Sequence, residues 1–187
     1  MMILIIGGSG SGKSSYGEQT AVSLSAGKDF KKYYIAAMKI FDGEGQKKAE
    51  RHRALRSGKG FITIEQPVDF FRVLEKMEEG NRTLLLECIS NLAANEMFSG
   101  EVPKPPMETA EKIIGEIQKV QRQVTHLIVV SNNVFEDGIA YEKTVMEYIQ
   151  AMGRINQKLA SMADRVVEVA AGIPITVKQE DSRICRF

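Results

Sequence analysis

Short apolar runs alternate along the chain with longer segments in which apolar residues recur at helical spacing. Short apolar runs predict buried strands, and a spacing of three to four residues predicts helices with one buried face. We expect strands at about 2–6, 33–37, 61–64, 83–86, 125–130, 166–169 and 173–177. We expect helices at about 14–25, 44–56, 68–77, 89–98, 108–122 and 142–163.

This alternation is typical of an α/β fold with a mostly parallel sheet and helices on both faces. The Gly-Ile-Pro sequence at 172–174 indicates a turn between the last two strands, so an antiparallel edge is expected near the C-terminus. In parallel sheets, ligands bind at the carboxyl ends of the strands. We therefore expect sites just after Ile6, Ala37, Leu86 and Val130.

The composition fits one globular domain, because 187 residues suffice for one sizeable α/β domain and are few for two. Lys and Arg total 25 against 24 Asp and Glu, a net charge of +1, which gives no indication of nucleic-acid or membrane-surface binding. No apolar run approaches the roughly 20 residues of a membrane span. Cys88 and Cys185 have neither metal-ligand spacing nor a disulfide framework, which favours the reducing cytoplasm.

The first apolar run is followed by a glycine-rich stretch, GGSGSGKSS, at residues 7–15. It matches the phosphate-loop pattern G-x-x-x-x-G-K-[ST] in the required order of strand, loop and helix. Glycines let backbone N–H groups turn inward around an anion, and the N-terminus of the following helix adds its dipole. A glycine-rich turn that binds nothing is the alternative. The expected triphosphate-binding residues are Gly7, Gly8, Ser9, Gly10, Ser11, Gly12, Lys13 and Ser14.

Within this loop, Lys13 is expected to reach the β- and γ-phosphates and Ser14 to hold Mg²⁺. Glu87 directly follows the apolar run 84–86, at the tip of a buried strand. P-loop enzymes commonly place an acid there to hold Mg²⁺, directly or through water, or to bind a ligand hydroxyl. A solvated strand end is the alternative for Glu87. Cys88 is expected to be a buried filler and not a nucleophile.

The two histidines lie in different surroundings. His126 begins an apolar strand, at the end opposite the expected site, and is expected to be structural. His52 lies in KKAERHRALR, where Lys48 and Arg56 would share its helical face. Such a cationic stripe attracts polyphosphate and keeps the imidazole neutral, and a neutral histidine can attack phosphorus. The residues alone leave open that this is only a charged, solvated helix face.

The chain resembles the adenosylcobinamide kinase / adenosylcobinamide-phosphate guanylyltransferase family of cobalamin biosynthesis. The resemblance covers about residues 2–178. It rests on IIGGSGSGKSS, YYIAAM, HRALR followed by FITIEQP, LLLECISNLAANEMF, and GRINQKLASMADRVVEVAAGIPITVK. Many families share the phosphate loop, whereas the H-x-x-x-R before a T-x-E, together with the G-R-x-N-Q-x-L-A run, is far more specific.

The resemblance implies one catalytic domain over residues 1–178, a homotrimer, and a tail at 179–187 of unassigned role. It also implies ATP and GTP as substrates, with Mg²⁺. His52 matches the histidine that becomes guanylylated, so His52 and Lys13 are the expected catalytic residues. Besides the phosphate loop, the nucleotide contacts implied are Ala36, Ala37, Met38, Arg53, Ala54, Leu55, Arg56, Glu65 and Glu87, with Ser14 and Glu87 as the Mg²⁺ ligands.

Two segments depart from the family pattern. Residues 132–139, NNVFEDGI, are one residue longer than the family's N-E-V-G-x-G-I and lack its first acid. The sequence VMEYIQA at 145–151 replaces a family R-x-F-R-D. We expect both segments near the strand ends, where the corrinoid or a neighbouring subunit would be met.

The activity implied is a two-step reaction. A triphosphate phosphorylates the aminopropanol arm of adenosylcobinamide, and GMP from GTP then passes through His52 to adenosylcobinamide phosphate, giving adenosylcobinamide-GDP. Two alternatives stay open at this point: a small-molecule kinase in which His52 only positions phosphates, and a binding or assembly module regulated by a nucleoside triphosphate.

Overall fold

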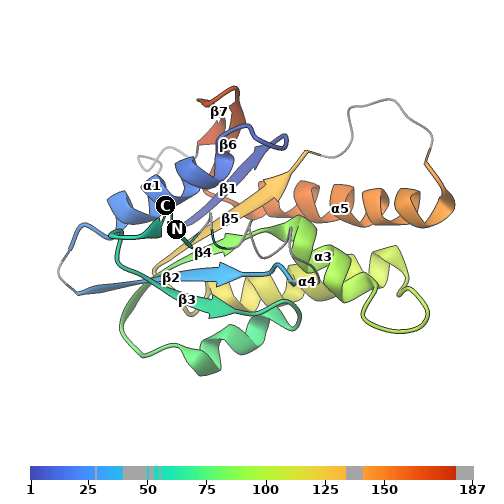
Figure 1. The fold of residues 1–187 in the computed structure, drawn as a ribbon, viewed down its shortest axis with the longest axis horizontal. Coiled ribbons are helices and arrows are strands. Elements are labelled where there is room, and N and C mark those ends of the chain that lie inside the picture. The colour runs from blue at the N-terminus through green and yellow to red at the C-terminus, as the bar shows by residue number, and fades with distance from the viewer. Residues whose placement is uncertain (28, 40–49, 51–52, 55, 134–140, 180–187) are drawn as a thin grey trace, which may run out of the picture.

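A seven-stranded sheet forms the centre of the protein (Figure 1), seen in a computed structural model that describes residues 1–27, 29–39, 50, 53–54, 56–133 and 141–179. The strand order across the sheet is β3-β2-β4-β5-β1-β6-β7. The strands are β1 (Met2–Gly7), β2 (Phe30–Ala36), β3 (Phe61–Glu65), β4 (Asn81–Glu87), β5 (His126–Asn132), β6 (Arg165–Ala170) and β7 (Ile173–Gln179).

The sheet is parallel except at one edge, where β7 runs antiparallel to β6. Among the described residues the helices are α1 (Lys13–Leu24), α3 (Ile89–Met97), α4 (Pro106–Gln121) and α5 (Lys143–Met162), with a short 3-10 helix, η1 (Phe70–Lys76). The helix α1 covers one face, and α3, α4 and α5 cover the other (Figure 1). The expected fold class, including the antiparallel edge, is confirmed.

Two apolar cores follow from the alternation of side chains along each strand. In β1, Met2 and Leu4 face the core under α4 and α5, whereas Ile3 and Ile5 face the core under α1. Because both faces are covered, β1 and the central strands read as continuous apolar runs. The parallel pairing brings the carboxyl ends of these strands together at one edge of the sheet.

The start of β2 is the boundary that differs most from expectation, and the helix expected at 68–77 is the 3-10 helix η1. The strand β2 begins at Phe30, earlier than expected, because the charged Lys31 and Lys32 also pair with β4. Most of the helix expected at 44–56 lies outside the described residues, as does the tail from residue 180. No helix of the described part of the chain is long and apolar enough to cross a membrane.

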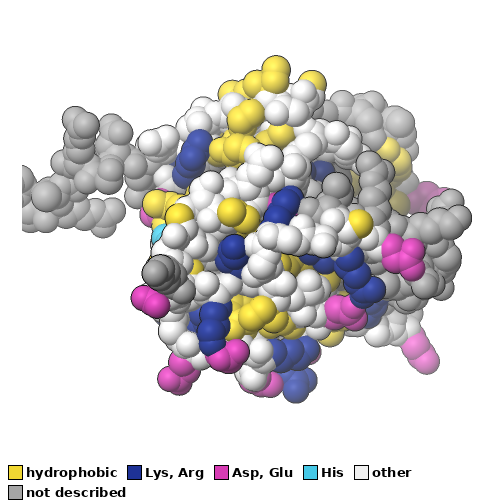
Figure 2. All heavy atoms as spheres, turned by 60° about the vertical axis from the view of Figure 1, so that its left-hand side comes forward, with side chains coloured by type: hydrophobic (Ala, Val, Ile, Leu, Met, Phe, Trp, Pro, Cys, Tyr) yellow, Lys and Arg dark blue, Asp and Glu magenta, His cyan; other side chains and the backbone are white. Residues whose placement is uncertain are grey.

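Charged side chains of both signs are interspersed on the face shown in Figure 2. Apolar side chains gather at the upper edge of that view. Figure 2 is turned from Figure 1 about the vertical axis only, and Figure 1 shows β7 at the same height. In this edge strand Ile173, Ile175 and Val177 are 64%, 50% and 64% exposed. Their exposure leaves an apolar row on the outer strand of the sheet.

Candidate functional site

The phosphate loop connects β1 to α1 at the carboxyl edge of the sheet. Gly7 has no room for a side chain, since an added Cβ would lie 2.5 Å from Ser11 Oγ and 2.6 Å from the Val169 carbonyl oxygen. Gly12 has a φ of +92°, a conformation that other residues rarely adopt. The loop is therefore shaped by its glycines, as the motif predicts. The tight turn after β6 also supports it, because Gly172 N–H donates to the Ser11 carbonyl (2.8 Å).

Lys13 begins α1 and is 7% exposed. Its ammonium donates to the Gly8 carbonyl at 2.9 Å, so it lies against the loop from which it would reach a bound phosphate. The exposed residues Gly8, Ser9 and Gly10 form the outer side of the loop. These positions agree with a loop that can surround a polyphosphate.

Ser14 and Glu87 come together from α1 and the end of β4. The Ser14 hydroxyl donates to Glu87 Oε1 at 2.7 Å. Burial raises the pKa of the Glu87 carboxyl to about 7, although the hydrogen bond from Ser14 and the charge of Lys13 oppose that shift. Glu87 Oε2 is buried and has no hydrogen-bond partner among the described residues. A hydroxyl beside a carboxylate with an open oxygen suits a hard cation such as Mg²⁺.

The end of β2 lies beside Glu87. Ala37 N–H donates to the Glu87 carbonyl at 3.0 Å, and Gln66 N–H donates to the Ala36 carbonyl at 3.0 Å. The Asn95 side chain donates to the Ala37 carbonyl at 2.7 Å. Ala37 is buried and Ala36 and Met38 are half-buried. The expected second nucleotide-contacting stretch is thus held next to the carboxylate expected to bind the metal.

Arg56, which follows His52 in the sequence, contacts the sheet at β2. Its guanidinium carbon lies 3.5 Å from the centre of the Tyr34 ring, and the residue is 7% exposed. Its Nη1 atom is a buried donor without a partner among the described residues. Its charge lowers the pKa of Glu87, so the guanidinium and that carboxyl are close enough to interact.

A second contact fastens the same segment to the phosphate-loop helix. Lys59 Nζ pairs with Glu18 at 2.5 Å, and Glu18 is 3% exposed. The chain after His52 is therefore held against β2 by Arg56 and against α1 by Lys59. Neither Glu18 nor Tyr34 was expected as a partner from the local pattern.

The remaining predicted residues lie near this segment or outside the described residues. Arg53 Nη2 donates to Glu65 Oε1 at 2.9 Å, and both side chains are more than half exposed. Ala54 is exposed. His52 and Leu55 lie outside the described residues, so their positions as nucleophile and nucleotide contact stay predictions.

A polar cluster at the ends of β4 and β5 was not predicted. Asn132 Nδ2 donates to Ser90 Oγ at 2.8 Å, and Ser131 Oγ donates to Asn156 Oδ1 at 2.6 Å. The Tyr148 hydroxyl donates to the Ser90 carbonyl at 3.1 Å. The only sequence signals were the Ser-Asn pair that ends the apolar run 127–130 and the Asn of the G-R-x-N-Q motif.

His126 and Cys88 are placed as expected. The His126 ring stacks on Phe30 with centroids 5.5 Å apart, at the start of β5 and far from the phosphate loop. Burial, helped by the N-terminal charge, lowers the His126 pKa. Cys88 is buried, and burial raises the pKa of its thiol, as expected of a filler and not of a nucleophile.

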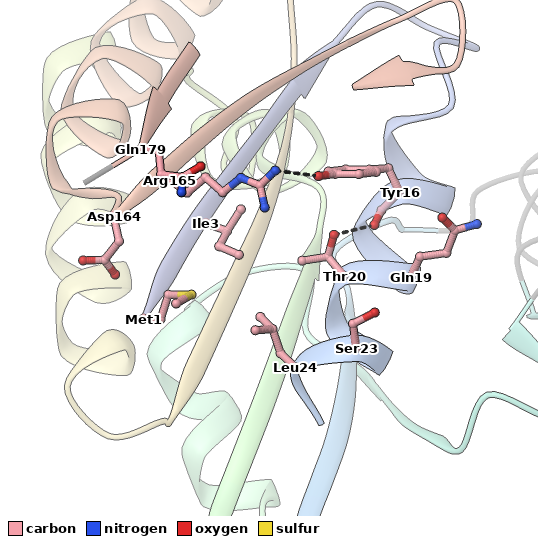
Figure 3. Close-up of a pocket in the computed structure, with 10 residues that line it drawn as sticks. All are labelled: Met1, Ile3, Tyr16, Gln19, Thr20, Ser23, Leu24, Asp164, Arg165 and Gln179. Atoms are coloured by element: carbon pink, nitrogen blue, oxygen red, sulfur yellow. Dashed lines mark hydrogen bonds between the residues drawn. The ribbon is translucent and has the colours of Figure 1, made fainter. Parts of the chain in front are cut away.

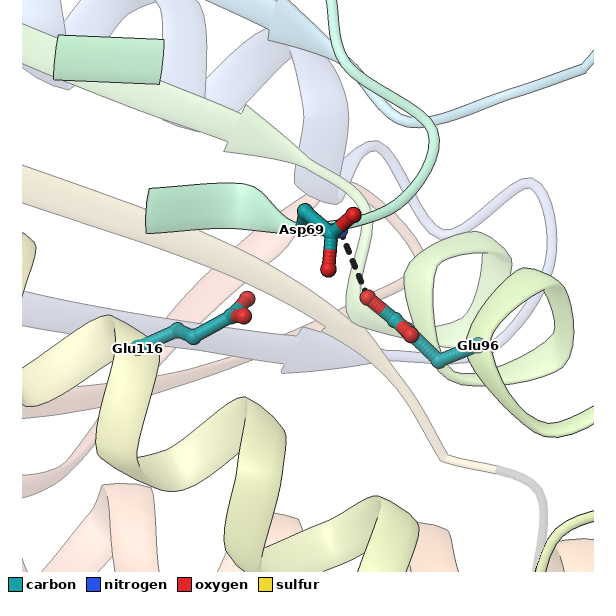
Figure 4. Close-up of side chains that lie close together, drawn as sticks. All are labelled: Asp69, Glu96 and Glu116. Atoms are coloured by element: carbon teal, nitrogen blue, oxygen red, sulfur yellow. Dashed lines mark hydrogen bonds between the residues drawn. The ribbon is translucent and has the colours of Figure 1, made fainter. Parts of the chain in front are cut away.

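Two further features lie away from the loop. Asp69, Glu96 and Glu116 converge (Figure 4), but Lys112 contacts all three carboxylates and neutralises much of their charge. A hollow of about 480 Å³ lies at the amino ends of β1 and β6, beside the end of α1. Figure 3 shows Arg165 at this hollow, donating to the Tyr16 hydroxyl (3.2 Å).

Solved structures support the class of protein that this geometry defines. A structure described as an ATPase domain superimposes with a TM-score of 0.54 and 11% identity, over 96% of this chain and 77% of that chain. The flagellar accessory protein FlaH from Methanocaldococcus jannaschii gives a TM-score of 0.51 and 14% identity, over 95% and 78%. At such identities the likeness shows the fold alone. With the loop, Lys13 and Glu87, the fold is that of a P-loop nucleoside-triphosphate-binding protein.

The family follows from the sequence comparison. The family model described as cobinamide kinase / cobinamide phosphate guanyltransferase matches residues 3–177, nearly the whole chain, and the chain belongs to this family. It is therefore a bifunctional enzyme of cobalamin biosynthesis with kinase and guanylyltransferase activities.

Curated relatives match over their whole length. The bifunctional adenosylcobalamin biosynthesis protein CobU of Escherichia coli is 29% identical over 95% of this chain and 100% of that protein. The protein CobP of the same description from Pseudomonas aeruginosa is 28% identical over 96% of this chain and 99% of that protein. The family membership confirms the resemblance and leaves the two alternative functions without support.

Proposed function

We propose that the protein phosphorylates adenosylcobinamide and then transfers GMP to the product through a covalent bond to His52. The observation that carries this proposal is the double anchor of the segment after His52, by Arg56 on Tyr34 and by Lys59 on Glu18. Both anchors hold the segment beside the phosphate loop and Glu87. The histidine segment and the loop would then serve the same nucleotide.

In the kinase step, the hydroxyl of the aminopropanol arm attacks the γ-phosphorus of a triphosphate bound at residues 7–14. The bond from that phosphorus to the β–γ bridging oxygen breaks, and the nucleoside diphosphate leaves. Lys13 and the loop N–H groups stabilise the charge that develops on the phosphate oxygens. Ser14 and Glu87 would hold Mg²⁺, which when bound neutralises charge on the β- and γ-phosphates. The Oε2 atom of Glu87 supports this assignment, because it has no hydrogen-bond partner among the described residues.

In the guanylyl step, a ring nitrogen of His52 attacks the α-phosphorus of GTP. The new N–P bond replaces the bond to the bridging oxygen, and pyrophosphate leaves. A phosphate oxygen of adenosylcobinamide phosphate then attacks the same phosphorus, which breaks the N–P bond, frees His52 and gives adenosylcobinamide-GDP. Arg56, whose buried Nη1 has no partner among the described residues, supplies a donor for the triphosphate oxygens.

We also infer a homotrimer in the cytoplasm, with residues 1–178 as the catalytic domain and 179–187 as an appended tail. The family resemblance implies the trimer and the cysteine usage favours the compartment. The exposed apolar row of Ile173, Ile175 and Val177 supports a subunit contact, because such a row gains stability when covered.

The experiment that tests the proposed function separates the two products. Adenosylcobinamide is incubated with ATP or GTP, and the corrinoids are resolved by chromatography. We expect adenosylcobinamide phosphate with at least one donor, and adenosylcobinamide-GDP only when GTP is present. The same reactions with ATP and GTP compared side by side identify the phosphate donor. Formation of adenosylcobinamide phosphate without adenosylcobinamide-GDP, even with GTP in excess, would instead identify a kinase alone.

A further inference from the structure

Asn132 is the last residue of β5 and lies beside the phosphate loop. In the parallel pairing of β1 and β5 it stands opposite Gly7, and the N–H of the next residue, Asn133, donates to the Gly7 carbonyl at 3.2 Å. On the other side of β5, Glu87 pairs with Val130. Asn132 therefore lies at the carboxyl edge of the sheet, between the strand that leads into the loop and the strand that ends in Glu87.

Of the two polar atoms of the Asn132 side chain, only the amide nitrogen has a hydrogen-bond partner among the described residues. Its Nδ2 donates to Ser90 Oγ at 2.8 Å, and Ser90 is itself 8% exposed. Ser90 Oγ also contacts Cys88 Sγ at 2.9 Å, and its carbonyl accepts from the Tyr148 hydroxyl. The residues around β4, α3 and α5 thus fix the orientation of the amide.

The backbone of Asn132 is fixed as well. Asn156, which is 8% exposed, donates to the Asn132 carbonyl at 3.4 Å and accepts from the Ser131 hydroxyl at 2.6 Å. Among the described residues, the Asn132 Oδ1 atom has no hydrogen-bond partner.

Asn132 Oδ1 is thus a buried acceptor that no described residue satisfies. Buried acceptors without partners are rare in native proteins, because they give up their hydrogen bonds to water. Phosphate oxygens cannot satisfy this atom, since they are acceptors too. The group that fits is a donor, and an alcohol substrate brings one to the phosphate loop.

We propose that Asn132 Oδ1 accepts a hydrogen bond from the attacking hydroxyl of the alcohol substrate. The inference rests on the kinase step of the proposed function and assigns the residue that aims the acceptor. The hydroxyl oxygen forms the bond to the γ-phosphorus, and the bond from that phosphorus to the β–γ bridging oxygen breaks. The hydroxyl proton leaves to solvent as the new bond makes it acidic. Asn132 positions the oxygen and takes no proton.

The test compares Asn132→Leu, which keeps the shape without the acceptor, with Asn132→Asp, which keeps an acceptor. Asn81→Leu, at the opposite, exposed end of β4, is the matched control. Three quantities are measured: kcat/KM for adenosylcobinamide, the Kd of a fluorescent GTP analogue, and protein guanylylation by GTP without corrinoid. The last two are measured without the alcohol substrate adenosylcobinamide.

In Asn132→Leu we expect kcat/KM for adenosylcobinamide to fall on the order of tenfold, the loss of one neutral hydrogen bond. Nucleotide affinity and protein guanylylation should stay within about twofold of the wild type and of the Asn81→Leu control, because neither involves the substrate hydroxyl. Asn132→Asp should recover phosphorylation in part. It should slow GMP transfer to adenosylcobinamide phosphate, because its carboxylate repels that anionic acceptor.

Unchanged kcat/KM in a folded Asn132→Leu protein would overturn the proposal. So would a parallel loss of GTP-analogue affinity, which would place the amide on the phosphates. If Asn132→Leu does not fold, Asn132→Asp decides: phosphorylation and GMP transfer slowed equally would contradict the proposed contact. A wild-type protein that phosphorylates no corrinoid would refute the proposed function itself, a result distinct from these.

Discussion

The replacement Glu87→Gln should make the unliganded protein more stable above neutral pH. Glu87 is half-buried at the end of β4 and its Oε2 atom is fully buried. Desolvation of the carboxyl is the main reason that its pKa rises from an ordinary 4.5 to about 7. Glutamine has nearly the same shape, and its carbonyl can still accept the hydrogen bond from Ser14. The variant therefore removes a buried ionisable group and little else.

The sign and size follow from linkage between proton binding and folding. The folded pKa of Glu87 lies above the unfolded value, so the folded protein binds this proton more tightly. The stabilisation is full below pH 4.5, falls as the pH rises through 7, and is absent above that. One pKa unit corresponds to about 1.36 kcal/mol. As the pH rises from 4.5 to above 7, the free energy of unfolding of the wild type should therefore fall by about 3 kcal/mol relative to that of the variant.

The assay is urea denaturation at pH 4.5 and pH 8, without nucleotide or Mg²⁺, for wild type and Glu87→Gln in parallel. Groups common to both proteins cancel in the difference. As a further control, Ser14→Ala removes the hydrogen bond that lowers the Glu87 pKa, so it should extend the pH dependence to higher pH. A difference between wild type and Glu87→Gln that does not change with pH would refute the reasoning.

Further predictions concern the phosphate loop, the contact of Arg56 with Tyr34, the ion pairs of Lys112 and the oligomeric state. Lys13→Ala should abolish both activities while the circular dichroism spectrum still shows the native fold. Its melting temperature should fall by a few degrees, because the 7% exposed lysine also donates to the Gly8 carbonyl. Arg56→Ala should weaken GTP labelling of the protein and lower stability by about 1 kcal/mol through the lost Tyr34 contact, measured by filter assay and denaturation. Lys112→Met should destabilise the protein at pH 8 by roughly 2 kcal/mol in a denaturation assay, because Glu96 is 2% exposed and loses a partner, without slowing the kinase. Light scattering at micromolar concentration should give the mass of a trimer, and a monomer would contradict the proposed assembly.

The phosphate loop and the fold class can be predicted well from the sequence because both are local patterns. The glycines of 7–12 are needed for the loop's own backbone, and the alternation of strands and helices determines how the sheet is covered. Glu87 could be placed because it directly follows a strand whose end must lie beside the loop. Its partner Ser14 belongs to the phosphate-loop motif.

Contacts between distant segments could not be predicted in the same way. Nothing in the residues around Arg56 indicates that its guanidinium stacks on Tyr34 of β2, or that Lys59 finds Glu18. The hydrogen bond between Asn132 and Ser90 likewise depends on how β5 and α3 lie side by side. Such pairs are set by packing across the sheet, which single-sequence periodicity does not encode.

The measurement that tests the central claim most directly is covalent labelling of the protein by GTP radiolabelled at the α-phosphate. After incubation with Mg²⁺ and denaturation, the label should stay on the wild-type protein and be lost in acid but not in base, as expected of a phosphoramidate. His52→Asn should carry no label and still phosphorylate adenosylcobinamide, because γ-phosphoryl transfer needs positioning and charge stabilisation and no covalent histidine. Label retained on His52→Asn, or absent from the wild type, would contradict the account.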